Sequence, residues 1–387
     1  MRATLPFNLA MTLLVLLAPG HIPAADSEPA AARTSSDQSK PTPSGLDSPG
    51  LSARAIAFYY PWYGNPETDG RYANWNHPVA VRNEPARSFP GGDDIGSNFY
   101  PALGCYSAND PRVLDEHARQ LRLAGVGVIC ASWWGKDTFT DRALPALFRA
   151  AEKAGLKINF HLEPFPGRNA TTTRAAIAYL IEKFGGSPAC HRLSSHGNRP
   201  VFFVYDSYKT PAKEWATVLS KEGLQTLRET ASDAVVIGLW VKKDEERFML
   251  EGAFDGFYTY FATDGFTYGS TVRNWPRLAE WARANHKLFV PCVAPGYIDT
   301  RIRPWNGVNT REREAGAYYD RMWSAALGLS PELVGITSFN EWHEGTQIEP
   351  AVPKQIPAFT YLDYQPLPTN YYLKRTAYWI GKWQPGR

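Results

Sequence analysis

Two glutamates stand close together after an apolar run near the C-terminal end of the chain. The stretch SFNEWHEGTQIEP, residues 338–350, places Glu341 and Glu344 three positions apart, with a tryptophan and a histidine between them. Side chains at this spacing point to opposite faces of a strand but become neighbours in a helical turn. Gly345 suits a turn directly after a strand at residues 333–338. The alternative is that one or both glutamates are solvated loop carboxylates.

Paired carboxyl groups are what glycoside hydrolysis needs. One carboxyl group protonates the departing oxygen, and the other acts as nucleophile or base. The two tasks need different pKa values, and desolvation together with a nearby like charge raises the pKa of one of them. Glu163, in the motif HLEP, is a third candidate and also follows an apolar run. It either accepts a hydrogen bond from a substrate hydroxyl or pairs with an arginine.

Aromatic side chains gather in the same segments as these glutamates. The chain has 13 tryptophans, 20 tyrosines and 19 phenylalanines, and such rings stack on the apolar faces of sugars as well as fill cores. Packing is the simpler explanation for any single ring, but their collective number favours a carbohydrate cleft. Beside the glutamates, the substrate-binding candidates are Tyr60, Trp75, His77, Trp134, Tyr260, Tyr297 and Asn340.

The sequence predicts a site without metal or cofactor. No HExxH or similar ligand spacing is present, and none of the four cysteines belongs to a CxxC pair. The alternative is a metal bound by His77, His161 and His343. If the cysteines form disulfides, their spacing alone leaves three connectivities open.

The candidate residues follow short apolar runs that alternate with amphipathic stretches. The expected strands are residues 55–60, 127–133, 157–162, 200–205, 235–239, 256–260, 288–293 and 333–338. The expected helices are residues 111–124, 140–154, 171–184, 211–229, 243–251, 274–285, 309–328 and 369–382. Eight strand–helix units predict one α/β domain, a (β/α)8 TIM-type barrel.

Four long segments follow expected strands, at residues 61–110, 261–273, 294–308 and 339–368. Barrel enzymes build their sites from loops at the C-terminal face, so these long loops are expected to hold the site. A doubly wound open sheet is the alternative architecture. It is disfavoured because PWYGN, residues 61–65, follows the first strand where such a sheet needs a glycine-rich phosphate loop.

The N-terminal residues predict export. Residues 1–25 resemble a signal peptide, with Arg2 at the start, an apolar stretch at 5–17 and small residues before the expected cleavage site. Residues 26–52 have the composition of a flexible linker, and residues 53–387 form the expected catalytic domain. We therefore expect a periplasmic or extracellular protein with no stable membrane span after cleavage. A membrane anchor formed by the apolar stretch is the alternative.

The charge balance gives no sign of a nucleic-acid partner. The net charge is +3, and acidic and basic residues are mixed along the chain without a basic block. The expected partner is an oligosaccharide or glycan substrate, and the sequence leaves the oligomeric state open.

Longer motifs carry a resemblance to a known family. The stretches FYYPWYGNPETDGRYANWNH, DDIGSNFYPALGCYS, YTYFATDGFTYGS, PGYIDTRIRPWN and SFNEWHEGTQIE together resemble glycoside hydrolase family 99, the endo-α-1,2-mannosidases and endo-α-1,2-mannanases. The resemblance extends from about residue 55 to about residue 383. It implies a (β/α)8 barrel without metal that cleaves inside α-mannoside chains with retention of anomeric configuration.

The resemblance also implies roles for single residues. It makes Glu341 the base, Glu344 the acid/base and Glu163 a sugar-binding carboxylate, with Tyr260 and Asn340 at other active-site positions. In this family the substrate's own O2 is described as attacking C1 to give a 1,2-anhydro sugar. O1 and O2 of an α-mannoside chair are both axial and anti to each other, so this displacement needs no enzyme nucleophile.

Trp134 concerns which sugar is preferred one position beyond the cleaved mannose, on its non-reducing side. The resemblance implies a mannose preference for a tryptophan at this position and a glucose preference for a tyrosine. The alternative is that Trp134 only packs the barrel mouth. A non-catalytic carbohydrate-binding barrel is the alternative function, although the intact ExxE motif favours the hydrolase. The natural glycan stays open.

Overall fold

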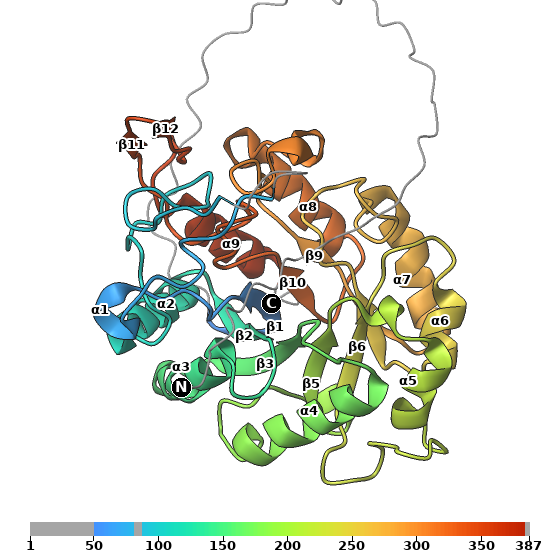
Figure 1. Cartoon of the computed structure of the whole chain (residues 1–387). Helices are drawn as coiled ribbons and strands as arrows, with labels where there is room; N and C mark the ends of the chain where they lie inside the picture. The colour runs from blue at the N-terminus through green and yellow to red at the C-terminus, as the bar shows by residue number, and fades with distance from the viewer. Residues whose placement is uncertain (1–49, 81–86, 384–387) are drawn as a thin grey trace, which may run out of the picture. The chain divides into compact units, whose positions relative to one another are not determined.

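The computed structural model describes residues 50–80 and 87–383, and in them a ring of parallel strands alternates with helices (Figure 1). The predicted signal peptide and most of the predicted linker, residues 1–49, lie outside the described residues. The strands of the ring are β1 (Ser52–Tyr59), β2 (Val126–Trp133), β3 (Lys157–Leu162), β5 (Arg199–Val204), β6 (Val235–Leu239), β7 (Gly256–Tyr258), β8 (Leu288–Val290), β9 (Cys292–Val293) and β10 (Val334–Ile336).

The ring closes through a strand that a proline interrupts. β8 pairs with β7, and β9 pairs with β10, which in turn pairs with β1. β8 and β9 are separated only by Pro291, which has no backbone N–H to give to a ladder. Counted as one strand, they complete a ring of eight parallel strands in the described residues. The predicted (β/α)8 barrel is confirmed.

The helices lie around the ring of strands in Figure 1. Their bounds are α1 (Pro66–Asp69), α2 (Pro111–Leu123), α3 (Phe139–Ala154), α4 (Ala170–Phe184), α5 (Ala212–Leu219), α6 (Glu246–Glu251), α7 (Trp275–Ala284), α8 (Ala317–Leu327) and α9 (Tyr371–Lys382). Short elements complete the chain: strands β4 (Arg192–Leu193), β11 (Gln355–Ile356) and β12 (Phe359–Thr360), and the 3₁₀ turns Ser194–His196, Ser207–Lys209, Val272–Asn274, Pro304–Asn309 and Glu314–Gly316.

Helix ends follow local signals where the sequence supplies them. The Asp110 side chain caps α2 by accepting a hydrogen bond from the Arg112 N–H, and Pro111 occupies the first turn. Gly155 ends α3 in the left-handed conformation, at φ +70°. These two boundaries agree with those expected from the sequence.

Three predicted helices were too long. The helix expected at 211–229 ends at Leu219, because the chain turns back so tightly that a Cβ on Gly223 would lie 2.4 Å from the Thr217 carbonyl oxygen. The helix expected at 309–328 begins only at Ala317, because Arg311 forms a bridge with Tyr297 across the mouth of the barrel. Similarly, α6 begins at Glu246 and not at residue 243.

Aromatic side chains fill the inside of the barrel. The ring of Phe58 on β1 lies 4.9 Å from that of His161, 5.7 Å from that of Phe203 and 5.8 Å from that of Tyr258, centroid to centroid. These residues come from four different strands, and all are buried. They form a packed layer inside the barrel, beneath the loops that follow the C-terminal ends of the strands. No helix of the described residues combines the length and the apolar character that a membrane crossing requires.

Candidate active site

The chain turns a few residues after β10, which ends at Ile336, and this turn contains Glu344 and begins just after Glu341. Residues 342–345 form a turn, and Gly345 adopts φ +60°, where a Cβ would lie 2.7 Å from the Ile298 carbonyl oxygen. The Glu341 N–H donates to Ser338 Oγ over 2.7 Å, and the Trp342 N–H donates to the Tyr63 hydroxyl over 3.1 Å. The turn brings both carboxyl groups to the same end of the barrel.

Glu341 is a buried acid with one oxygen left over. Its Oε1 accepts a hydrogen bond of 3.1 Å from the His343 N–H, whereas Oε2 is buried and has no hydrogen-bond partner. Burial raises the pKa of Glu341 to about 8, and the nearby Arg303 opposes this rise. Burial also lowers the pKa of the His343 imidazole to about 4, so the ring beside Glu341 is neutral near pH 7. An unpartnered buried carboxylate oxygen can accept a hydrogen bond from a ligand or from a water molecule.

Glu344 is the more exposed acid of the pair, with 20% of its side chain accessible. Its Oε1 lies 3.4 Å from Arg303 Nη1, which also contacts Asp299 Oδ2 at 2.8 Å. Burial raises the pKa of Glu344 to about 8, Arg303 lowers it, and the negative charge of Glu341 raises it further. Burial thus raises the pKa of both glutamates, and Arg303 opposes the rise in both.

Arg303 is a site residue that the sequence reasoning missed. It lies in the loop after β9, where Asp299 holds it in place. Asp299 Oδ2 also accepts hydrogen bonds of 2.8 Å from the Tyr297 hydroxyl and from the Asn306 side chain. This loop contains the motif PGYIDTRIRPWN, which is one of the stretches that resemble family 99. Nothing in the local pattern, however, indicated which of its arginines faces the glutamates.

Glu163 is held on one oxygen only. Its Oε1 accepts hydrogen bonds from Ser132 Oγ over 2.8 Å and from His161 Nδ1 over 3.0 Å. In the part of the chain that the structure describes, Oε2 accepts none. Because the carboxylate of Glu163 can only accept, Nδ1 of His161 carries the proton, and a neutral His161 then accepts at Nε2 from the Tyr258 hydroxyl over 2.7 Å. A single fixed orientation thus leaves one carboxylate oxygen of Glu163 available.

Two tyrosine hydroxyls lie among the three acids. The hydroxyls of Tyr60 and Tyr260 hydrogen-bond to each other. Burial raises the pKa of Tyr60 well above its usual value, and the charges of Tyr260, Glu163, Glu341 and Glu344 raise it further. Tyr260 itself is held at φ +33°, an uncommon conformation for a bulky residue that is stabilised by the hydrogen bond from the Thr337 hydroxyl to its carbonyl oxygen.

The structure thus brings together five of the predicted residues, which follow strands β1, β3, β7 and β10: Tyr60, Glu163, Tyr260, Glu341 and Glu344. The chain matches the glycosyl hydrolase family 99 model over residues 50–385. It belongs to this family. The glycoprotein endo-α-1,2-mannosidase of Rattus norvegicus is 45% identical over 354 residues, which are 88% of this chain and 77% of the rat protein. The Xenopus laevis protein of the same name is 46% identical over 84% of this chain and 76% of its own.

A solved structure supports the same family. The family 99 endo-α-mannosidase from Bacteroides thetaiotaomicron is 47% identical, covers 86% of this chain and 98% of its own, and superposes with a TM-score of 0.84. A glycoside hydrolase-like protein at 15% identity and a TM-score of 0.58 shares the fold. This family 99 chain is therefore a glycoside hydrolase.

Asn340 and Trp75 lie in the site's supporting layer. Asn340 accepts a hydrogen bond of 2.7 Å from the Tyr60 N–H and donates one of 3.2 Å to the Tyr60 carbonyl, so it fixes the backbone of Tyr60. Trp75 is buried, stacks on Tyr63 with ring centroids 4.0 Å apart, and donates its indole N–H to the Tyr106 carbonyl over 2.8 Å. The structure does not bring the Trp75 ring to the acids.

The remaining predicted residues line the edge of the site in this family 99 chain. His77 packs on His343 with ring centroids 4.6 Å apart. Trp134 is partly buried and lies 6.1 Å from the ring of Trp62. Tyr297 is also partly buried and reaches the glutamates through Asp299 and Arg303.

The three histidines named as alternative metal ligands do not converge. His77 and His343 are in contact, whereas His161 bonds to Tyr258 and Glu163. Across residues 50–80 and 87–383, no group of three or more His, Cys, Asp or Glu side chains is arranged to hold a metal ion. The four cysteines are unpaired thiols.

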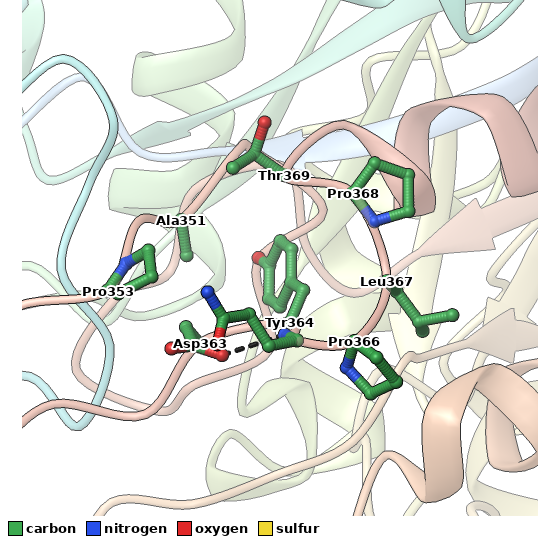
Figure 2. Close-up of a pocket in the computed structure, with 9 residues that line it drawn as sticks. Ala351, Pro353, Asp363, Tyr364, Pro366, Leu367, Pro368 and Thr369 are labelled. Atoms are coloured by element: carbon green, nitrogen blue, oxygen red, sulfur yellow. Dashed lines mark hydrogen bonds between the residues drawn. The ribbon is translucent and has the colours of Figure 1, made fainter.

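A separate hollow lies in the segment after the turn that contains Glu344 (Figure 2). It measures about 690 Å³ and is lined by Ala351, Pro353, Asp363, Tyr364, Gln365, Pro366, Leu367, Pro368 and Thr369. Its buried tyrosine, Tyr364, is bonded through its hydroxyl to the carbonyl of Glu349 over 2.8 Å. None of the candidate catalytic residues lines this hollow, so the chemistry lies elsewhere.

Proposed function

We propose that this chain is a retaining, endo-acting glycoside hydrolase that cleaves internal α-1,2-mannosidic bonds in mannans or high-mannose glycans. The observation that carries the proposal is the buried, unpartnered Oε2 of Glu341 beside Glu344, because such a pair can hold a base and an acid together. The names of the rat and Xenopus relatives, endo-α-1,2-mannosidases, support the choice of bond.

In the first step Glu341 accepts the proton of the 2-hydroxyl of the cleaved mannose. O2 then attacks C1 as the bond from C1 to the departing oxygen breaks. Glu344 gives its proton to that departing oxygen, and a 1,2-anhydro sugar forms. The raised pKa of Glu344 keeps its proton available near neutral pH, and the raised pKa of Glu341 makes its ionised form a stronger base.

In the second step water attacks C1 and opens the anhydro ring. Glu344 accepts a proton from the water, and Glu341 returns its proton to O2. C1 is inverted twice, so its configuration is retained, and both glutamates end in their starting states. Each carboxyl group changes its protonation in both steps, which suits acids whose raised pKa values lie near neutral pH.

A substrate lacking the free 2-hydroxyl tests the proposal. A 2-deoxy or 2-O-methyl analogue at the cleaved mannose should bind competitively but should not be hydrolysed. Efficient hydrolysis of either analogue would contradict participation of O2 and favour an ordinary carboxylate nucleophile. Binding of the unmodified glycan without any cleavage would instead support a carbohydrate-binding barrel.

We further propose that this chain prefers mannose to glucose one position beyond the cleaved mannose, on its non-reducing side. Trp134 supplies a larger apolar ring for the axial-hydroxyl face of mannose than a tyrosine would. One such contact discriminates by about 1–3 kcal/mol. The measurement is kcat/KM for Man-Man and Glc-Man donors in the wild type and in Trp134→Tyr. A wild type that favours glucose would contradict this preference and leave the hydrolase assignment intact.

The N-terminal composition supports export of the chain as part of the proposal. Residues 1–25 are proposed as a cleaved signal peptide, and residues 53–387 as the catalytic domain. Mass determination of the mature N-terminus after secretion from a bacterial host is the direct test. A mature chain that retains residues 1–25 would indicate the membrane anchor instead.

A further inference from the structure

We propose that Ser132 is a positioning residue that sets the sugar preference of the site by holding Trp134 and Glu163 through one hydroxyl group. The inference rests on the proposed function, in which Trp134 contacts the glycan, and on the sugar-binding role that the family resemblance implies for Glu163. It concerns how these two side chains are kept in place, and not which bond is cleaved.

The hydrogen bonds around Ser132 have a fixed direction. The indole of Trp134 donates its Nε1–H to Ser132 Oγ over 3.1 Å, and Ser132 Oγ donates to Glu163 Oε1 over 2.8 Å. An indole N–H can only donate, and a carboxylate can only accept. The serine hydroxyl is the one group between them that does both, so it determines the separation of the two side chains.

Strand geometry explains why Trp134 and not Trp133 takes part. Ser132 lies near the end of β2, and side chains two positions apart share one face of a strand. Trp134 therefore follows Ser132 onto the site face. Trp133 points the other way, where its indole N–H donates to Asp141 Oδ1 over 2.9 Å.

Trp134 is fixed at both its backbone and its ring. Its backbone N–H donates to Thr140 Oγ1 over 3.0 Å, and its indole N–H donates to Ser132. A flat ring can distinguish an axial from an equatorial hydroxyl only if its plane is held in one orientation. Such precision depends on supporting hydrogen bonds of this kind.

Removing the Ser132 hydroxyl should affect the position of Trp134 more than that of Glu163. In Ser132→Ala, Glu163 keeps the hydrogen bond from His161 on the same oxygen. The indole of Trp134 loses the acceptor that orients it. We therefore expect the sugar preference to weaken more than the rate of cleavage of the preferred donor.

The measured quantity is the ratio of kcat/KM for a Man-Man donor to that for a Glc-Man donor. We expect this ratio to fall at least threefold in Ser132→Ala, which is a part of the ~10–200-fold discrimination that one apolar contact can supply. Ser132→Thr keeps a hydroxyl on the same carbon and should restore the wild-type ratio. An unchanged ratio in Ser132→Ala overturns the inference.

A matched control is available in Ser207. It is also a fully buried serine, but its hydroxyl bonds only to the backbone of Leu239. Ser207→Ala should lower Tm without changing the ratio. If it changes the ratio as much as Ser132→Ala does, the effect is general loosening and the inference fails.

A double-mutant cycle provides the second measurement. Trp134→Phe removes the indole N–H, so adding Ser132→Ala to it should change the ratio no further. Additive changes would overturn the inference. If Ser132→Ala does not fold, the ratio is measured in Trp134→Phe alone. An unchanged ratio in Trp134→Phe would show that the indole N–H is not needed and would overturn the inference. A wild type that cleaves neither donor would contradict the proposed function itself. That outcome is distinct from an unchanged ratio, which would contradict only the role of Ser132.

Discussion

Glu341 and Glu349 are two buried acids on the same loop, and they differ in their partners. Glu349 is completely buried and accepts from three side chains: His117 Nε2 at 3.1 Å on Oε1, and the Tyr106 hydroxyl at 2.8 Å and the Trp342 indole at 2.9 Å on Oε2. Glu341 is almost as buried, but its Oε2 has no partner.

Under the proposed function, the difference distinguishes an acid that holds structure from one whose free oxygen accepts from the substrate. A buried carboxyl group whose oxygens are all hydrogen-bonded contributes to a rigid network. One that lacks partners costs stability, and such a cost persists where a function needs it. Glu349 fixes Trp342, which stands between the two proposed catalytic residues, and so the structural acid positions the functional ones.

The largest expected effect is on catalysis at the unpartnered acid. Glu341→Gln should reduce kcat by at least ~10²–10⁴-fold, because the 2-hydroxyl loses its base, even for a substrate with an activated leaving group. Tm should not fall, because the variant removes no hydrogen bond from Oε2. A variant that loses activity only in proportion to its loss of folded protein would mean that Glu341 is structural like Glu349.

Glu344→Gln provides the matched comparison within the catalytic pair. It should reduce kcat on a natural mannoside by ~10²–10⁴-fold, because proton donation to the departing oxygen is lost. A donor with an activated leaving group should be affected much less in its first step. Equal losses on both substrates would show that Glu344 is not the acid.

Glu349→Ala should mainly lower stability, whereas Glu341→Gln should mainly lower kcat. Glu349→Ala leaves the His117, Tyr106 and Trp342 donors buried without an acceptor, and each such donor costs about 1–3 kcal/mol, which together amounts to several kcal/mol. The free energy of unfolding, from a urea titration, should fall by that amount. Glu349→Gln should recover most of it, because the amide oxygen still accepts from Tyr106 and Trp342, and its NH₂ can donate to the other tautomer of His117. A stable but inactive Glu349→Ala would erase the distinction between the two acids.

The pH dependence of stability gives a smaller test of the same comparison. The pKa of Glu341 is raised from 4.5 to about 8 in the folded chain, so the folded state binds more protons than the unfolded state between these values. Its contribution to stability is fully present below about pH 4.5 and is lost as the pH rises towards about 8. Relative to Glu341→Gln, the Tm of the wild type should therefore fall across this range. A constant difference in Tm would contradict the raised pKa.

The smallest expected effect is a shift in the pH profile of activity. Arg303 lowers the pKa of both Glu341 and Glu344, so Arg303→Gln should raise both values and move the profile of kcat/KM to higher pH. Arg303→Lys keeps a positive charge and should shift the profile less. A shift to lower pH in Arg303→Gln would show that the arginine acts through packing and not through its charge.

Local patterns in the sequence determined the barrel and the positions of its acids. The alternation of apolar runs with amphipathic stretches is a property of neighbouring residues, and it placed Glu163 and Glu341 at strand ends because strand length and helix period are local. The same reasoning predicted the turn after residue 338 from Gly345. It failed at residues 211–229 and 309–316, where helix-forming residues are drawn into turns by packing that local propensity does not contain.

Only the tertiary structure decided which partners each side chain has. Glu341 and Glu349 look alike in SFNEWHEGTQIEP, and the difference comes from His117 on α2 and Tyr106 in the loop before α2, both of which closure of the barrel brings to Glu349. Asn340 became a support for Tyr60 in the same way. Periodicity fixes which face a residue occupies, whereas hydrogen bonds between distant segments depend on how all eight strands close into a ring, and no single stretch of sequence encodes that closure.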